Sequence, residues 1–396
     1  MERLKQLSIK AVNRTNFNFK RYLYSTINWD RRMIGITGAR GTGKTIMMLQ
    51  YLKQIQATEN AMYISLDDVY FAENKLVYFA EDFVKYGGTY LLIDEVHKYR
   101  NWSQELKNIY DNLPELKIIF TSSSALEIHK GSHDLSRRAV LHNLAGLSFR
   151  EFLKLKYNID LPTYTLEQIL SNSDKIVTEI LKRSRPLALF NEYLKEGYYP
   201  FFLDANSDYL KQLISSINLV LESDLPAIHN IDFSSIIKLK SLLSIISRIV
   251  PFKPNIEKLA RQTNTSRETL LKYLYYLDKA QTIKWLGSNT NGINYLNKPD
   301  KIYLANTNIA YALSENNTNI GNLRETFFLN QLSQNNIVTY PKKGDFMVND
   351  KYLFEIGGKD KTNKQIAGIK DAYIAADDIE YGFANKIPLW LFGFLY

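Results

Sequence analysis

The sequence contains no cysteine. Disulfide bonds, thiolate metal sites and cysteine nucleophiles are therefore excluded. Histidine is also scarce, with five residues along the chain. We assign no catalytic role to any of them: His97, His129, His133, His142 and His229.

Long apolar runs are missing as well. The stretch "SLLSIISRIVPF" (241–252) is broken by Arg248 and Pro251, whereas a membrane span needs about 18 or more consecutive apolar residues. The first 24 residues alternate charged and apolar side chains and never form the apolar core of a signal peptide. The sequence therefore predicts a cytoplasmic protein that does not enter a membrane.

No low-complexity tract and no internal repeat interrupts the 396 residues, a length that favours two or three domains. A hydrophobic content of 45% with 23% charged residues is ordinary for a soluble globular protein. The net charge of +9 favours phosphate-bearing partners such as nucleotides or nucleic acid, although many soluble proteins carry as much without binding either.

Short β-rich runs alternate with helical patterns in the first third of the chain. The expected strands are 33–37, 61–65, 89–94 and 116–120, with helices beginning at Lys44 and Ser103. This alternation predicts an α/β fold with a parallel sheet and covering helices. From about residue 147 to 245 the pattern is almost wholly helical, which favours a helical lid or a second domain.

Residues 256–296 read as a helix, a polar turn, a second helix and two strands around "GSNTNG". Thr265 and Glu268 have capping-box spacing at the start of the second helix. The pattern predicts a winged helix-turn-helix. A further α/β unit follows residue 300, with a helix at 322–332, strands around 345–348 and 351–356, a helix from Asn363, and a closing strand at 387–396.

The most specific motif is "GARGTGKT", which lies between an expected strand and an expected helix. Its glycines let backbone N–H groups close around phosphates, and the helix N-terminus adds partial positive charge. Lys44 would neutralise the phosphates, and the Thr45 hydroxyl would bind Mg²⁺. The predicted nucleotide-binding residues are Gly38, Ala39, Arg40, Gly41, Thr42, Gly43, Lys44, Thr45 and Asp94.

The second half of such a site is a carboxylate at the end of a neighbouring strand. "YLLIDE" ends in Asp94 and Glu95, about fifty residues after Lys44. Asp94 would hold the Mg²⁺ shell together with Thr45, and Glu95 would polarise the attacking water.

Two further sets of polar residues follow this motif along the chain. Thr121 or Ser122, after "LKIIF", would contact the γ-phosphate or the water; the alternative is a Ser/Thr-rich turn. Arg137 or Arg138 would reach a γ-phosphate as an arginine finger, in this chain or in a neighbouring subunit; the alternative is a solvated pair of charges.

The motifs "GARGTGKT", "SLDD", "LLIDEVHKYRNWSQELK", "FTSSSALE" and "LSFREFL" occur in this order. In these motifs the chain resembles the bacterial and archaeal AAA-like ATPases that carry a C-terminal domain of unknown function. Where that family usually shows a Gly-Arg pair after the fourth core strand, this chain has Arg137 and Arg138, with Arg138 at the arginine position.

The resemblance implies four parts, the last similar in fold to PD-(D/E)XK nucleases. We place them at 1–146 (ATPase core with an N-terminal helical segment), 147–240 (helical lid), 241–300 (winged helix) and 301–396 (nuclease-like domain). In the winged helix, the cations that would meet nucleic-acid phosphates are Arg267, Lys272, Lys284 and Lys298. The apolar residues of "LLKYLYYL" indicate instead that much of this helix is buried and that the domain is a spacer.

Nucleases of the PD-(D/E)XK kind use an Asp and a Glu on adjacent strands, and a Lys two residues after the Glu. Asp345 and Glu355 match the acidic pair, and Glu325 resembles the upstream acidic residue. The lysine position is taken by Gly357, so Lys359 is the candidate, provided that the two glycines do not turn it away from Glu355. Gln365 and Tyr373 are expected on one face of the following helix.

These motifs favour a Mg²⁺-dependent ATPase that switches or remodels a partner, either an unknown protein or DNA or RNA. ATP is preferred over GTP because no guanine-reading N-K-x-D motif lies in the core. Two alternatives stay open: an ATP-gated nuclease, and a regulatory module that binds nucleotide without turnover. Assembly into a homo-oligomer is compatible with all three.

Overall fold

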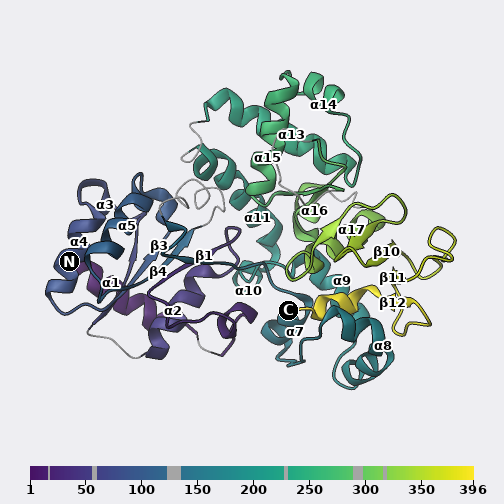
Figure 1. The fold of residues 1–396 in the computed structure, drawn as a ribbon, viewed down its shortest axis with the longest axis horizontal. Helices are drawn as coiled ribbons and strands as arrows, with labels where there is room; N and C mark the ends of the chain where they lie inside the picture. Colours follow the sequence, from purple (N-terminus) through teal and green to yellow (C-terminus); the bar gives the residue numbers. More distant parts are fainter. Residues whose placement is uncertain (17, 56–59, 123–134, 227–230, 289–297, 315–318) are drawn as a thin grey trace. The chain divides into compact units, whose positions relative to one another are not determined.

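The structure is a computed structural model that describes the 396 residues except 17, 56–59, 123–134, 227–230, 289–297 and 315–318. The chain forms two compact units (Figure 1). Unit 1 comprises Met1–Ala145 and Leu219–Ile231, and unit 2 comprises Gly146–Asn218 and Asp232–Tyr396. The residues 219–231, which we expected within a helical lid, thus group with the first unit. Three of the five histidines, His129, His133 and His229, lie outside the described residues.

Unit 1 contains a parallel sheet with strand order β2-β3-β4-β1-β5, which confirms the predicted fold class of this region. The central strands are buried along nearly their whole length because helices cover both faces of the sheet. The strands are β1 (Met33–Thr37), β2 (Ala61–Ser65), β3 (Tyr90–Asp94), β4 (Lys117–Ser122) and β5 (Val140–Asn143).

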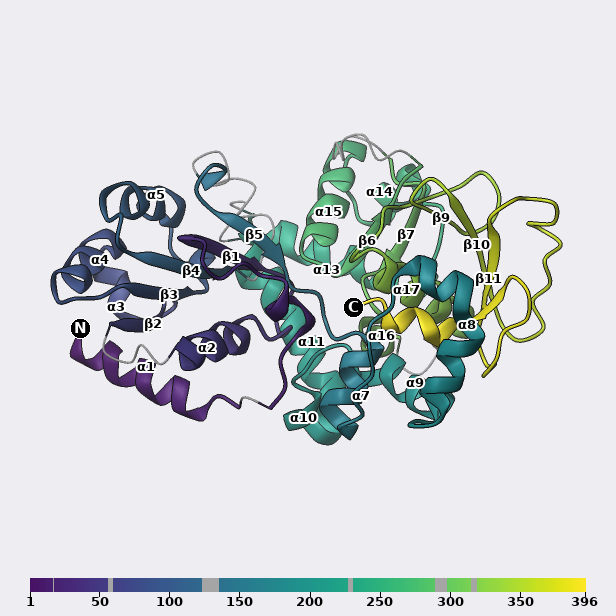
Figure 2. The same ribbon diagram turned by 60° about the horizontal axis from the view of Figure 1, so that its bottom comes forward.

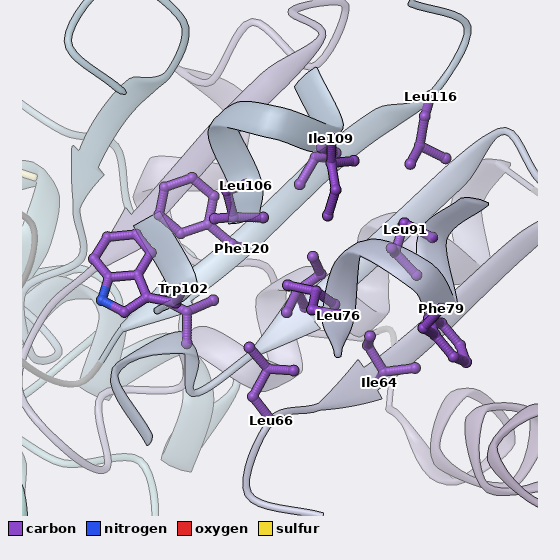
Figure 3. Packing of buried hydrophobic residues seen from close by; sticks show 14 of the residues in the cluster. Ile64, Leu66, Leu76, Phe79, Leu91, Trp102, Leu106, Ile109, Leu116 and Phe120 are labelled. Atoms are coloured by element: carbon purple, nitrogen blue, oxygen red, sulfur yellow. The ribbon is translucent and has the colours of Figure 1, made fainter. Parts of the chain in front are cut away.

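Helices cover the two faces of this sheet (Figure 2). On one face, Met47, Met48 and Leu52 of α2 pack against β1, β3 and β4. On the other face, α4 and α5 pack over the strands through the apolar residues drawn in Figure 3, among them Phe79, Leu106 and Phe120. The helical elements between Glu2 and Asn112 are α1 (Glu2–Arg14), η1 (Tyr22–Ser25), α2 (Lys44–Ile55), α3 (Tyr70–Glu73), α4 (Leu76–Lys85), η2 (Val96–Lys98) and α5 (Trp102–Asn112).

Strands β1, β3 and β4 run parallel, so their carboxyl ends lie at one edge of the sheet. The phosphate-loop motif leaves β1 at this edge and leads into α2, which begins at Lys44 as predicted. Strand β3 ends there at Asp94, and β4 ends there at Ser122. The topology therefore brings the three predicted parts of the nucleotide site together.

Unit 2 begins with a helical region. Its elements are α7 (Phe149–Tyr157), α8 (Leu166–Leu181), α9 (Pro186–Glu196), α10 (Phe202–Ala205), η3 (Asn206–Asp208) and α11 (Tyr209–Leu219). Ser148 and Glu151 form a reciprocal capping box at the start of α7, which explains where this helix begins. The chain then enters the unit 1 segment, whose first part, Val220–Asp224, is a π-helical turn (η4).

Three helices and a two-stranded antiparallel sheet follow in unit 2: α13 (Phe233–Ile249), α14 (Ile256–Gln262), α15 (Arg267–Lys279), β6 (Ile283–Leu286) and β7 (Lys301–Leu304). The predicted Thr265–Glu268 capping box is wrong by one residue. The N-cap is Ser266, whose hydroxyl accepts the Thr269 N–H, while Thr265 instead contacts the Thr263 hydroxyl. The second predicted wing strand falls largely within 289–297, outside the described residues.

The last part of unit 2 is a mixed sheet with order β12-β11-β10-β9-β8. The predicted hairpin is present: β9 and β10 are antiparallel, joined at Asn349–Lys351. The remaining elements are α16 (Thr307–Leu313), α17 (Ile320–Leu332), β8 (Val338–Thr339), β9 (Phe346–Val348), β10 (Tyr352–Gly357), β11 (Ala372–Ala376), β12 (Lys386–Pro388) and η5 (Leu389–Phe394).

Two predicted elements in this region are wrong. No helix begins at Asn363; residues 363–368 form turns, so Gln365 and Tyr373 do not share a helix face. The closing strand ends at Pro388, and the apolar residues after it form the 3₁₀ helix η5, which is buried throughout. A continuous apolar run cannot by itself distinguish a buried strand from a buried helical segment.

Among the residues that the structure describes, no helix combines the length and the apolar character needed to cross a membrane.

Candidate functional site

The phosphate-loop motif adopts a backbone that requires glycine. Gly38, Gly41 and Gly43 have φ angles of 146°, 83° and 95°, a region that side chains with a Cβ rarely enter. A Cβ at Gly38 would also lie 2.3 Å from the Leu144 carbonyl oxygen. The glycine spacing therefore encodes the loop conformation as well as access to a ligand.

Lys44 is buried at the start of α2. Its ammonium donates hydrogen bonds to the carbonyl oxygens of Gly38 at 3.0 Å and Ala39 at 2.8 Å, so the side chain folds back over the loop. Burial lowers the pKa of Lys44, since the charged form loses hydration. An anionic ligand at the loop would offset that cost.

Arg21, a buried arginine that the sequence motifs did not identify, supports the phosphate loop through hydrogen bonds. The Arg21 guanidinium donates hydrogen bonds to the Thr42 carbonyl at 2.5 Å and to the Ala145 carbonyl at 2.8 Å. It thereby ties the phosphate loop to the chain that leaves β5. No spacing in the sequence marks this residue, because its partners are 21 and 124 residues away.

Asp94 is surrounded by hydroxyl groups. Thr45 and Tyr63 donate hydrogen bonds to its Oδ2 atom at 2.8 and 2.9 Å, and Thr121 donates to Oδ1. The structure thus brings the predicted pair Thr45 and Asp94 into direct contact. Tyr63, on β2, is an addition to the predicted set; burial and the neighbouring Asp94 carboxylate raise the pKa of its phenol well above the usual range.

The residues around Asp94 fit a magnesium site that is completed by a nucleotide. Mg²⁺ prefers oxygen ligands, and it usually takes only one or two from the protein beside phosphates and water. Thr45 and Asp94 supply such a pair. No group of three or more His, Cys, Asp or Glu side chains within the described part of the chain is placed to hold a metal ion.

Glu95 follows β3 in a left-handed conformation, with φ at 55°. Its backbone N–H donates to the Thr121 hydroxyl at 3.1 Å. Its carboxylate Oε2 lies 3.2 Å from Nε2 of His97, a residue to which the sequence assigned no role.

Thr121 and Ser122 form the end of strand β4 and are fully buried, so they are not a surface turn. The Thr121 hydroxyl links the Asp94 carboxylate to the Glu95 backbone. Ser122 Oγ lies 3.4 Å from Nδ1 of His97. Both side chains thus support the two predicted carboxylates from the adjacent strand.

Asp224 is an acidic residue of this site that sequence reasoning missed. Its side chain is 1% exposed, and it is paired with Lys98 at 2.6 Å and with Arg40 of the phosphate loop at 3.7 Å. His97 Nε2 lies 3.7 Å from the same carboxylate. Burial alone would raise the pKa of Asp224, but hydrogen bonds and charges from His97 and Lys98 outweigh burial and hold it well below its usual range.

The candidate arginine finger is engaged elsewhere. Arg138 forms a two-pronged ion pair with Asp111 of α5, with Nε–Oδ1 and Nη2–Oδ2 distances of 2.8 and 2.7 Å. Arg137 is exposed in the same turn before β5. Arg138 is thus held by α5 in this structure, and the finger role stays a prediction.

The predicted acidic residues of the C-terminal region form a second cluster, within unit 2. Glu325 on α17 accepts hydrogen bonds from Lys301 at 2.6 Å and Tyr303 at 2.9 Å. Asp345 accepts the Ile356 N–H at 2.8 Å beside Glu355. Burial, with the charge of Asp345 nearby, raises the pKa of both Glu325 and Glu355.

The prediction for Lys359 is wrong, because Lys361 occupies the position beside Glu355. The Lys361 ammonium lies 2.5 Å from Glu355 Oε1, whereas Lys359 is 63% exposed and lies 3.8 Å from Asp378. The chain turns after β10, with Lys361 N–H donating to the Gly358 carbonyl at 3.0 Å. A Cβ at Gly357 would lie 2.6 Å from the Lys361 side chain, so the glycine leaves the space that this lysine crosses.

Gln365 also reaches this cluster, although from a turn. With its amide nitrogen facing Glu355, it donates to the two carboxylate oxygens at 2.8 and 3.2 Å. Tyr373 lies on strand β11, where its ring packs against Phe354. The prediction that Gln365 and Tyr373 share one helix face is therefore wrong. Gln365 nevertheless contacts Glu355, from a turn and not from a helix.

The cationic residues of α15 that we predicted to contact nucleic acid lie near the beginning of the helix. Arg267 and Lys272 are exposed, and so is Lys298 before β7, while Lys284 on β6 is partly buried. Six apolar or aromatic residues of α15 are buried, as the sequence indicated: Leu270, Leu271, Tyr273, Leu274, Tyr276 and Leu277. The two exposed cations of this helix, Arg267 and Lys272, thus lie in its first turns.

Comparisons with known proteins assign the class of the first region. Residues 30–153 match the family described as "AAA domain", and residues 187–320 match a domain of unknown function (DUF8612). With the parallel sheet and the phosphate loop, the first match identifies a P-loop domain of the AAA class of ATPases. The nuclease-like assignment of residues 301–396 stays a prediction.

The chain is also similar to uncharacterized protein MJ1637 of Methanocaldococcus jannaschii, with 26% identity over 300 residues, 69% of this chain. The match spans 62% of that relative's length. Solved structures similar to parts of the chain include AMPPCP-bound DnaA from Aquifex aeolicus, with 17% identity, 69% of this chain and 88% of that chain covered, and a TM-score of 0.27. Another is PCH-2 of C. elegans, with 16% identity, 69% and 67% covered, and a TM-score of 0.26.

Proposed function

We propose that the protein is a Mg²⁺-dependent ATPase that uses hydrolysis to switch or remodel a partner. One observation carries the proposal: Thr45 and Asp94 are in contact at 2.8 Å beside a phosphate loop that holds Lys44, with Glu95 next in the chain. This combination supplies phosphate binding, a magnesium ligand pair and a base for water in one place.

In the proposed reaction the loop N–H groups and Lys44 bind the β- and γ-phosphates and neutralise their charge. When bound, Mg²⁺ would be held by Thr45 and Asp94 and would neutralise further charge on the phosphates. Glu95 accepts the proton of the attacking water. Thr121 keeps the two carboxylates in register, since it contacts the Asp94 side chain and the Glu95 backbone.

The test compares Lys44→Ala with Glu95→Gln in purified protein. Lys44→Ala should abolish nucleotide binding, because it removes the cation of the loop. Glu95→Gln should retain ATP binding and lose turnover, because the amide cannot accept the proton. If wild-type protein does not bind ATP, or if Glu95→Gln hydrolyses ATP at the wild-type rate, the proposed function is wrong. Binding without any turnover would favour the regulatory module instead.

The proposed partner is either a nucleic acid or a protein. Arg267 and Lys272 at the exposed start of α15 can contact nucleic-acid phosphates, as a winged helix would do. Binding of duplex DNA at two salt concentrations, with Arg267→Gln and Lys272→Gln, tests this surface. A salt slope equal in wild type and variants would favour a protein partner.

In a homo-oligomer, Arg138 of a neighbouring subunit would act on the nucleotide in trans. A mixture of Arg138→Ala and Glu95→Gln subunits tests this arrangement.

A second candidate function, an ATP-gated nuclease, is favoured by the 2.5 Å contact between Lys361 and Glu355. A lysine beside an acidic residue matches the pattern of PD-(D/E)XK nucleases, in which the lysine orients or activates the water. Plasmid, linear and single-stranded substrates incubated with Mg²⁺ or Mn²⁺, with and without ATP, test it. Cleavage that persists in Glu355→Gln would be a contaminant and would count against this candidate.

A further inference from the structure

Charged side chains from three separate stretches of unit 1 meet beside Glu95. Arg40 belongs to the phosphate loop, His97 and Lys98 follow Glu95 directly, and Asp224 comes from the segment 219–231. Lys98 also donates to the Ser223 hydroxyl at 2.9 Å, so it holds two consecutive residues of that segment. The segment is thus attached to the nucleotide site by its polar side chains.

The position of His97 is fixed on both sides of its ring. The side chain is fully buried, and Nε2 faces Glu95 at 3.2 Å and Asp224 at 3.7 Å. Nδ1 faces the Ser122 hydroxyl at 3.4 Å. The tautomer with its proton on Nε2 donates to Asp224 and leaves Nδ1 to accept from Ser122. Oε2 of Glu95 lies in contact with Nε2 but accepts no hydrogen bond from it. Strand β4 and Asp224 therefore orient the ring, and the ring lies in contact with the Glu95 carboxylate.

Asp224 connects this arrangement to the phosphate loop. A buried carboxylate is stable only when cations and hydrogen bonds compensate it, and here those cations include Arg40. A polyphosphate at the loop presents negative charge to the same guanidinium. Asp224 is also among the charges that act on Lys44. The carboxylate of Asp224 and the phosphates of a nucleotide therefore act on the same cations.

We infer that His97 is a positioning residue for Glu95, and that Asp224 anchors His97 while competing with the nucleotide for Arg40. The inference rests on the proposed ATPase function. His97 does not transfer the proton; it holds the carboxylate that does. Removing the contact between His97 and Glu95 lowers kcat, whereas removing the Asp224 charge lowers kcat and tightens nucleotide binding.

Two substitutions of similar size separate this role from a structural one. In His97→Gln the amide nitrogen can occupy the place of Nε2, donate to Asp224 and keep the contact with Glu95. In His97→Asn the shorter side chain reaches only the place of Nδ1. We expect His97→Asn to lower kcat by roughly 10-fold to 100-fold with a nearly unchanged nucleotide Kd, because small misplacements of a catalytic group have effects of this order. His97→Gln should retain most of the activity.

The Asp224→Asn variant keeps the shape of the side chain and removes its charge. We expect a lower kcat together with a several-fold lower Kd for ATP and ADP. The matched control is Glu222→Gln, an exposed carboxylate two residues away in the same segment, for which both quantities should equal those of wild type. A general loss of structure would weaken binding instead of tightening it.

The experiment measures kcat and the Kd of a fluorescent ATP analogue for wild type, Glu95→Gln and these four variants, with thermal unfolding as a check of folding. Wild type without Glu95-dependent turnover overturns the proposed ATPase function and the inference with it. With turnover established, equal kcat values for His97→Asn and His97→Gln overturn the positioning role. An unchanged or weaker affinity in Asp224→Asn overturns the competition. If Asp224→Asn does not fold, Arg40→Gln tests the same pair from the other side and should weaken binding while leaving Asp224 in place.

Discussion

The two acidic clusters of this protein differ in how their carboxylates are stabilised. In unit 1, Asp224 is surrounded by Lys98, His97 and Arg40, and its pKa is held far below the usual range. In unit 2, Glu325 and Glu355 lie near Asp345, and burial raises the pKa of both. The first cluster is thus built to keep a negative charge at neutral pH. In the second, the charged state of Glu325 and Glu355 costs folding energy.

The largest expected difference between the clusters concerns turnover. Glu95→Gln should reduce ATP hydrolysis by roughly 100-fold or more, the usual range for removing a general base. Glu355→Gln should leave hydrolysis unchanged, because that carboxylate belongs to the other unit. Steady-state phosphate release measures both. Equal losses in the two variants would show that the clusters act in one reaction.

The next difference concerns stability at neutral pH. Asp224→Asn should lower the free energy of unfolding of unit 1 by about 3 kcal/mol, because it breaks a buried network and leaves cations uncompensated. The depressed pKa determines the direction in which this stabilisation changes with pH. The contribution of the charge is present above the ordinary carboxyl pKa of about 3.9 and is lost as the pH falls through the depressed value.

Denaturant titrations between about pH 3 and pH 8 measure this effect. The stability difference between wild type and Asp224→Asn should shrink steadily below about pH 4. The control Glu222→Gln should show no such trend. A difference that stays constant with pH would mean that Asp224 stabilises the segment by packing and not by charge.

Glu355→Gln should behave in the opposite way. Because its folded-state pKa is raised, ionisation of Glu355 costs folding free energy above that pKa, and the cost is absent below the unfolded value of about 4.3. The variant should therefore be more stable than wild type at pH 8 and equal to it at low pH. Thermal unfolding across the same range checks this, and a destabilised variant at pH 8 would contradict it.

The smallest expected effect compares two lysines. Lys361→Gln should lower stability by roughly 1 kcal/mol, since it removes the partner of a carboxylate that is 2% exposed. Lys359→Gln should change little, because exposed ion pairs contribute close to nothing. Chemical denaturation of the two variants measures the difference. An equal loss in both would mean that the 2.5 Å contact does not persist in solution.

The conformation of the phosphate loop could be predicted because its motif specifies local backbone. The glycines at 38, 41 and 43 adopt positive φ angles that other residues rarely reach, and Lys44 begins the helix that must follow. Asp94 and Glu95 could be placed because parallel strands end at one edge of the sheet. The same logic failed after Gly357, where a turn decides which lysine returns to Glu355.

By itself, then, the sequence determined the phosphate loop, the parallel sheet around it and the acidic hairpin of unit 2, since short-range geometry and the alternation of apolar residues encode these. Only the tertiary structure decided the supporting residues. Asp224 reaches Lys98 across 126 positions and Arg21 reaches Ala145 across 124. No periodicity links such residues, because their contacts arise from how the elements pack and not from where they stand in the chain.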